Sequence, residues 1–166
     1  MRILFLGDVV GVSGCSKLTS NLFSIIKENK IDFVIVNGEN AASQGVGLTK
    51  EICKDFFNCG VNVITTGNHV WDQKEIMEFI EKEERLLRPK NLFEPAPGKG
   101  FYIYKIKENI KIGVLNLMGN VFMKKCEDVF EASQTFLKKN KLREDYDLLV
   151  IDFHGEITSE KNAIGH

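Results

Sequence analysis

The sequence predicts an α/β fold built around a parallel β-sheet. Short continuous runs of apolar residues alternate with longer segments in which apolar residues recur at helical spacing. A chain that alternates strand and helix in this way forms parallel strands whose crossover helices cover the sheet. The chain has 166 residues, 43% of them hydrophobic. This length fits one domain, 1–166, and the composition can supply its core.

The first half of the chain contains three predicted strand–helix pairs. Each strand is a short apolar run, as in strands that are buried on both faces. Ser16 is the expected N-cap of the first helix, Thr49 is expected to open the second, and Asp72 with Glu75 forms a capping-box pattern at the third. The expected strands are 2–6, 33–37 and 61–66, and the expected helices are 16–29, 49–58 and one that begins at residue 72.

The second half is less regular. Residues 88–100 contain all three prolines and are expected to form a loop. Two strands, 101–107 and 110–117, then follow with a tight connection at Glu108-Asn109, which predicts a hairpin. The last expected elements are a helix over 125–140 with Val129, Phe136 and Leu137 inward, a buried strand over 147–151, and a helix that begins near Ser159.

The bulk composition excludes some classes of function. The formal net charge is −1, so there is no general cationic field for binding nucleic acid. No stretch reaches the roughly 20 apolar residues that a membrane span needs. Asp8 and Gly11 interrupt the first apolar segment, so we expect no signal peptide and a cytoplasmic location. The four cysteines form no Cys-x-x-Cys pair and are expected to be reduced thiols.

Small polar clusters follow four of the predicted strands, at the point where each ends. Ligands of parallel sheets bind beyond the carboxyl ends of the strands, and carboxylate, amide and imidazole groups are ligands of divalent metals. Taken singly, the aspartate also fits a turn, the glutamate a solvated loop, and each histidine a structural role. The candidate residues are Asp8, Glu39, Asn40, Asn68, His69 and, with Asp152 before it, His154.

Four motifs carry a resemblance to a known family. They are Leu6-Gly7-Asp8-Val9-Val10-Gly11, Asn37-Gly38-Glu39-Asn40-Ala41-Ala42, Thr66-Gly67-Asn68-His69-Val70-Trp71 and Asp152-Phe153-His154-Gly155-Glu156. The chain resembles the calcineurin-like metallophosphoesterase superfamily and, more narrowly, its bacterial YmdB-like branch of 2′,3′-cyclic-nucleotide phosphodiesterases. Val10 replaces the histidine of the superfamily's Asp-x-His opening, and Glu39 stands where most members carry aspartate. Both departures are typical of the branch.

The resemblance implies a layered α/β/β/α sandwich and a phosphodiesterase that uses two divalent metals, either Fe, Mn or Zn. Hydrolysis would use a hydroxide that bridges the metals. By resemblance, Asp8, Glu39 and Asn40 hold one metal, and Glu39, Asn68 and His154 hold the other. His69 protonates the leaving oxygen or steadies the phosphoryl group. The expected substrate is a small phosphodiester or nucleotide.

The family completes its site with a later Gly-x-His-x-His segment that is absent here. The resemblance covers about the first three-fifths of the family's length, so we expect an incomplete C-terminal part of the sandwich. An exposed sheet edge or apolar surface would then favour a homo-oligomer. The alternative function is an inactive module that binds metal or phosphate. A dinucleotide-binding domain is disfavoured because the Gly-x-Gly-x-x-Gly spacing is missing.

Overall fold

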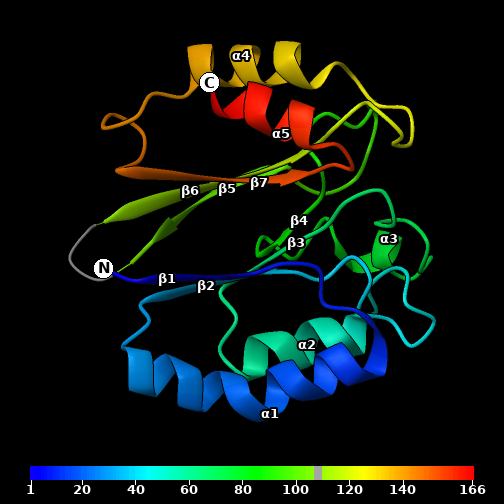
Figure 1. Ribbon diagram of the computed structural model, residues 1–166, viewed down its shortest axis with the longest axis vertical. Coiled ribbons are helices and arrows are strands. Elements are labelled where there is room, and N and C mark those ends of the chain that lie inside the picture. Colours follow the sequence, from blue (N-terminus) through cyan, green and yellow to red (C-terminus); the bar gives the residue numbers. More distant parts are fainter. Residues whose placement is uncertain (107–109) are drawn as a thin grey trace.

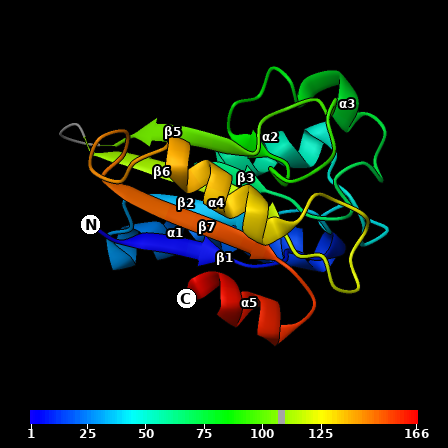
Figure 2. The same ribbon diagram turned by 90° about the horizontal axis from the view of Figure 1, so that it is seen from above.

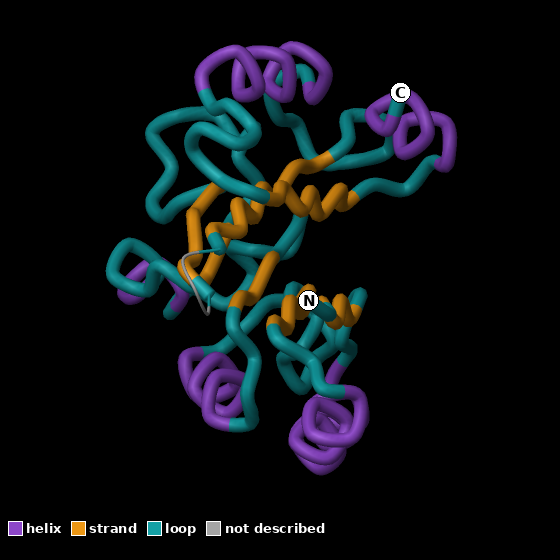
Figure 3. The backbone as a smooth tube through the Cα atoms, turned by 90° about the vertical axis from the view of Figure 1, so that its left-hand side faces the viewer, coloured by secondary structure: helices purple, strands orange, loops and turns teal. Residues whose placement is uncertain are grey.

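The computed structural model describes residues 1–106 and 110–166. It has four layers, in which two β-sheets face each other and helices cover their outer faces (Figure 1). Helices α1 and α2 lie on one side of the sandwich, and α4 and α5 lie on the other (Figures 1 and 3). The predicted α/β sandwich is therefore confirmed.

The first sheet is entirely parallel, with its strands in the order in which they occur in the chain. The strand after the third helix was not predicted, because it has only two residues and directly precedes the proline-rich loop. The side chain of Thr49 accepts a hydrogen bond from the Ile52 amide, as expected of an N-cap. The elements are β1 (Ile3–Leu6), α1 (Gly11–Asn29), β2 (Phe33–Asn37), α2 (Lys50–Asn58), β3 (Val63–Thr65), α3 (Ile76–Phe79) and β4 (Leu86–Leu87).

The second sheet is mixed. The predicted hairpin strands pair antiparallel, and the last strand then joins the central one in parallel. The predicted turn at Glu108-Asn109 lies outside the described residues, which omit 107–109. The elements are β5 (Phe101–Lys105), β6 (Lys111–Met118), α4 (Val129–Lys139), β7 (Leu148–His154) and α5 (Thr158–Gly165).

A buried apolar core lies between the sheets. Phe33, Ile35 and Val63 of the first sheet belong to one cluster with Ile112 and Val114 of the second. Two further clusters fill the space between each sheet and its helices. None of the helices described in residues 1–106 and 110–166 has the length and apolarity that crossing a membrane requires.

Three local expectations are wrong. Helix α1 begins at Gly11 rather than after Ser16, because the Gly11 amide donates to the Asn40 carbonyl at 2.8 Å and so needs no side-chain cap. The third helix begins at Ile76, since the carboxylate of Glu75 accepts instead from the Lys50 amide. On α4, Leu137 is exposed, and Ser133 is buried between Val129 and Phe136.

Strands β1 and β7 were expected to be buried on both faces, and this is also wrong. Each is the outer strand of its sheet, and the two lie on the same side of the sandwich (Figure 2). Phe5 of β1 and Ile151 of β7 are correspondingly exposed. Edge strands can pair with another chain, and a homo-oligomer formed through an exposed edge or apolar surface stays a prediction. All four cysteines are free thiols.

Candidate metal centre

One polar contact between the two sheets sets the position of the candidate site. Asn37, at the end of β2, donates from Nδ2 to the Asp152 Oδ2 of β7 at 3.0 Å. Burial raises the pKa of Asp152, although hydrogen bonds from Thr65 and Asn37 act to lower it. Side chains two apart on a strand share a face. The contact therefore brings His154 over the carboxyl ends of the first sheet.

Glu39 lies at the centre of the site. Its side chain is buried, with the residue only 1% exposed, and Oε1 lies 2.9 Å from the Nε2 of His154. Oε2 accepts from the backbone amide of His69 at 3.2 Å. In the described part of the chain, no lysine or arginine forms an ion pair with this carboxylate. A buried carboxylate is costly without a compensating positive charge. His154 supplies that charge only when it is protonated, so beside a neutral His154 Glu39 is suited to hold a cation.

His154 connects Glu39 to a second donor. Its Nε2 lies 2.9 Å from Asn68 Oδ1 as well as 2.9 Å from Glu39 Oε1. Burial lowers the pKa of His154, but the hydrogen bond to Glu39 and the charge of that carboxylate outweigh it, so the net pKa is raised. Two oxygens and one nitrogen thus converge. Such a set of donors suits a borderline divalent metal.

Asn40, with Asp8 beside it, approaches the same carboxylate oxygen of Glu39 that contacts His154. The Nδ2 of Asn40 donates to Asp8 Oδ1 at 2.8 Å and contacts Glu39 Oε1 at 3.5 Å. The Oδ1 of Asn40 is buried without a hydrogen-bond partner among the described residues. An unsatisfied buried acceptor costs about 1–3 kcal/mol. Asp8 itself has a φ of 39°, a left-handed conformation that is rare outside glycine and clusters at functional sites.

Gly67 leaves space for the side chains of Glu39 and His154. A Cβ at this position would lie 2.2 Å from Glu39 Oε2 and 2.3 Å from His154 Cδ2. Both distances are far shorter than a van der Waals contact. The glycine between β3 and Asn68 is therefore required by the close approach of the two site side chains.

His69 lies beside this cluster, with its side chain 30% exposed. Its Nδ1 is 2.6 Å from Asp72 Oδ2, and Asp72 Oδ1 accepts from Lys124 at 3.0 Å. Hydrogen bonds with His69 and with Lys124 lower the pKa of Asp72. With Nδ1 facing a carboxylate, proton exchange with a substrate would use Nε2.

Sequence reasoning missed the roles of Asp72, Lys124 and Asn37. Asp72 was interpreted as part of a capping box, so its contact with His69 was not predicted. Lys124 lies in a loop with no motif, and its contact with Asp72 spans 52 positions. Asn37 stood inside a motif, but its partner Asp152 could be identified only after the two sheets were packed.

The structure brings five of the predicted residues into one contact network, which we call the Glu39 cluster: Asp8, Glu39, Asn40, Asn68 and His154. His69 joins it through its backbone amide. The unpartnered amide oxygen and the buried carboxylate fit a bound cation. Counting only histidine, cysteine, aspartate and glutamate, residues 1–106 and 110–166 hold no group of three that could bind a metal. A metal here would therefore depend on the amides of Asn40 and Asn68.

Residues 4–166 match the family described as YmdB-like protein. A 2′,3′-cyclic-nucleotide 2′-phosphodiesterase of Bacillus subtilis (strain 168) is 43% identical over 166 residues, which are 99% of this chain and 61% of that protein. Two crystal structures are similar in fold. One is a hypothetical protein from Thermus thermophilus, with a TM-score of 0.90, 36% identity and coverage of 100% of this chain and 62% of the other.

The second crystal structure is a novel phosphatase from Mycoplasma pneumoniae. It has a TM-score of 0.88 and 35% identity, and the match covers 98% of this chain and 58% of that one. The chain thus spans about three-fifths of the length of these relatives. Because the family match extends over nearly every residue, from 4 to 166, the chain belongs to the YmdB-like protein family.

Proposed function

We propose that this chain carries a dinuclear-metal site for hydrolysing phosphodiesters, with 2′,3′-cyclic nucleotides as substrates. The observation that carries the proposal is the buried carboxylate of Glu39, whose Oε1 lies near both His154 and Asn40, with no lysine or arginine paired with it in the described part of the chain. The printed activity of the Bacillus subtilis relative supports the substrate class. The chain belongs to the same family as this relative, which supports hydrolysis of a phosphodiester as the reaction.

The residues of the Glu39 cluster would divide between two metals. Asp8, Glu39 and Asn40 would hold one, and Glu39, Asn68 and His154 would hold the other. Mixed oxygen and nitrogen donors favour Fe, Mn or Zn over magnesium. Two such ions, when bound, activate water at neutral pH and neutralise charge on the phosphate oxygens.

His69, oriented by Asp72, would donate a proton to the leaving group. Opening a cyclic phosphodiester breaks one bond between phosphorus and a ribose oxygen, and that oxygen needs a proton as it leaves. Asp72, 2.6 Å from Nδ1, orients the imidazole and favours a proton on that nitrogen. With Nδ1 keeping its proton, the ring can act as an acid only as the imidazolium, which carries a second proton on Nε2. Nε2 would deliver that second proton to the leaving oxygen, a role that contributes about 10²–10⁴-fold to rate in enzymes.

Hydrolysis of 2′,3′-cyclic AMP with added Mn²⁺ tests the proposal, with the monophosphate product followed by chromatography. We expect His69→Ala to lower kcat by about 10²–10⁴-fold while metal content is kept. Glu39→Ala should lose metal and activity together. His166→Ala removes an exposed histidine outside the site and should keep the wild-type rate. A wild-type rate equal to that of the Glu39→Ala, His69→Ala double variant would refute the proposed enzymatic function.

A second candidate function is a non-catalytic module that binds metal or phosphate. It is favoured by one observation: no three histidine, cysteine, aspartate or glutamate side chains within residues 1–106 and 110–166 form a metal-binding group. Metal analysis beside the hydrolysis assay separates the two. Two metals per chain with turnover supports the phosphodiesterase, whereas bound metal without turnover supports the module.

A further inference from the structure

A mostly apolar pocket opens beside the Glu39 cluster. Its volume is about 480 Å³, which is within the usual range for small-molecule sites. Three segments form its wall: the stretch that follows β3, the loop between β4 and β5, and the end of β6 with the loop after it. The apolar lining includes Trp71, Met77, Leu92, Phe93, Pro97 and Met118.

The pocket and the cluster share a wall. Gly67 and Asn68 line the pocket, and the Oδ1 of Asn68 is 2.9 Å from His154 Nε2. A phosphoryl group held at the cluster would therefore have the rest of its molecule beside the apolar lining. Phe93 lines the pocket and is 55% exposed, whereas Met118 in the same lining is completely buried.

The charges around the pocket favour an anionic ligand. Lys74, Lys124 and Lys125 belong to its lining, and no aspartate or glutamate does among the described residues. Lys124 is held by Asp72, the same carboxylate that contacts His69. The cationic rim is thus connected to the residue proposed to donate the proton.

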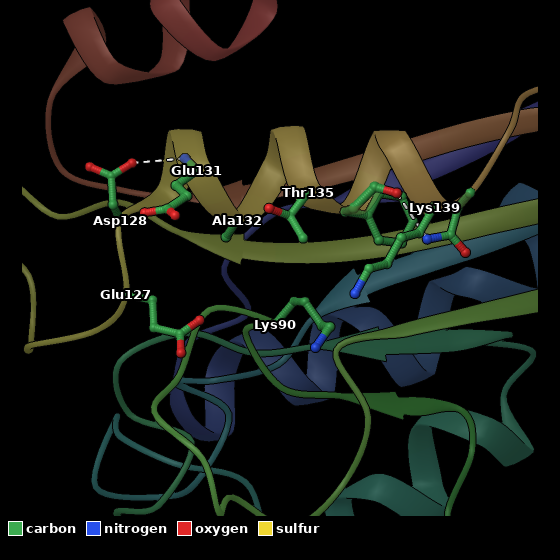
Figure 4. Close-up of a pocket in the computed structure, with 9 residues that line it drawn as sticks. Lys90, Glu127, Asp128, Glu131, Ala132, Thr135 and Lys139 are labelled. Carbon is green, nitrogen blue, oxygen red and sulfur yellow. Dashed lines mark hydrogen bonds between the residues drawn. The ribbon is translucent and has the colours of Figure 1, made fainter.

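Another cavity does not share these features. It has a volume of about 520 Å³ and runs along α4 (Figure 4). Lys90 and Lys139 line it, but so do Glu127, Asp128 and Glu131. Three carboxylates oppose a phosphate ester, and no residue of the Glu39 cluster reaches this cavity.

We propose that the pocket beside Asn68 binds the aromatic base of a phosphoester substrate, with Phe93 and Trp71 as the residues that select base-bearing over base-free esters. This inference rests on the proposed function and adds the location of the base. Every base has a flat face that stacks on an aromatic ring. Phe93 and Trp71 therefore select for the presence of a base more than for its identity.

Trp71 allows binding to be measured without turnover. It is the only tryptophan of the chain, so its fluorescence reports occupancy of the pocket. The probes are adenosine 3′-monophosphate and ribose 5-phosphate, which lacks a base. With Mn²⁺ present, we expect the nucleotide to quench Trp71 saturably, and calorimetry to give a Kd at least about tenfold tighter than for ribose 5-phosphate.

Variants in the pocket and away from it test whether the base binds there. Phe93→Ala should weaken nucleotide binding about tenfold and leave ribose 5-phosphate binding unchanged. Met77→Ala, a second pocket variant at an exposed side chain, should also weaken nucleotide binding. Phe23→Ala removes a phenylalanine that is 72% exposed on α1, away from the pocket, and should change neither Kd.

Two results would overturn the inference: equal affinity for the two probes, or a nucleotide Kd unchanged in both Phe93→Ala and Met77→Ala. Its failure is distinguishable from failure of the proposed function. Hydrolysis with no base dependence of binding leaves the phosphodiesterase in place and removes the base pocket. Base-dependent quenching without hydrolysis leaves the base pocket in place and removes the phosphodiesterase.

Discussion

A methyl group at Gly67 should disturb the Glu39 cluster directly. In Gly67→Ala the new Cβ would lie 2.2 Å from Glu39 Oε2 and 2.3 Å from His154 Cδ2. Contacts between heavy atoms are favourable only near 3.5 Å, so each partner would have to move by roughly 1 Å. Glu39 is fully buried, and His154 is held by both Glu39 and Asn68. Moving either side chain would disturb these contacts.

Such overpacking costs about 1–3 kcal/mol, which lowers the Tm of a chain of this size by about 2–10 °C. Thermal unfolding followed by circular dichroism would measure the shift, and calorimetry should show Mn²⁺ binding weakened at least about tenfold by the displaced donors. Gly165→Ala, where a Cβ meets nothing within 4 Å, is the matched control. Wild-type Tm and Mn²⁺ affinity in Gly67→Ala would refute the reasoning.

Three further predictions concern positions outside the cluster. Burial raises the pKa of Cys53 to about 12, so iodoacetamide at pH 8 should label it only after unfolding, as mass spectrometry would show. Burial raises the pKa of Glu83, but hydrogen bonds from Arg85 outweigh it and leave the pKa lowered. Glu83→Gln should therefore lose up to about 1 kcal/mol at pH 7, and chemical denaturation should show the difference shrinking as the pH falls below the ordinary glutamate pKa and vanishing below the lowered pKa of folded Glu83. Asn91 is fully buried and bonds both the amide and the carbonyl of Met118. Asn91→Ala should cost about 2–4 kcal/mol in the same assay, and a loss below about 1 kcal/mol would contradict this.

The sequence pattern predicted the helices and strands whose boundaries are set by neighbouring residues. Strand β2, 33–37, was predicted to the residue, because its apolar run ends abruptly at polar neighbours. The start of α1 was missed because a tertiary bond, from the Gly11 amide to the Asn40 carbonyl, decides it. Continuous apolar runs also predicted burial for β1 and β7, whereas burial depends on how many strands flank them.

The candidate site was predictable for the same reason that it is compact. The carboxyl ends of parallel strands meet at one edge of a sheet, so residues 8, 39, 40 and 68 could be grouped from strand ends alone. His154 comes from the other sheet, and its approach depends on the bond between Asn37 and Asp152, 115 positions apart. No local pattern contains that bond, so the strand ends predicted His154 as a candidate but not the contact that brings it to the site.

Three unfavourable features coincide in the Glu39 cluster. Asp8 has a left-handed backbone, the amide oxygen of Asn40 is buried without a partner among the described residues, and Glu39 is buried without a lysine or arginine paired with it in that part of the chain. The first two cost of order 1–3 kcal/mol each, and apolar side chains would fill the same space more favourably. Pairing with a protonated His154 would compensate Glu39, but it accounts for neither the amide oxygen of Asn40 nor the left-handed backbone of Asp8. A bound cation would compensate the carboxylate and the amide oxygen together, and the left-handed turn would be retained because it presents Asp8 to the same ion. This common explanation is the physical reason for proposing a metal centre.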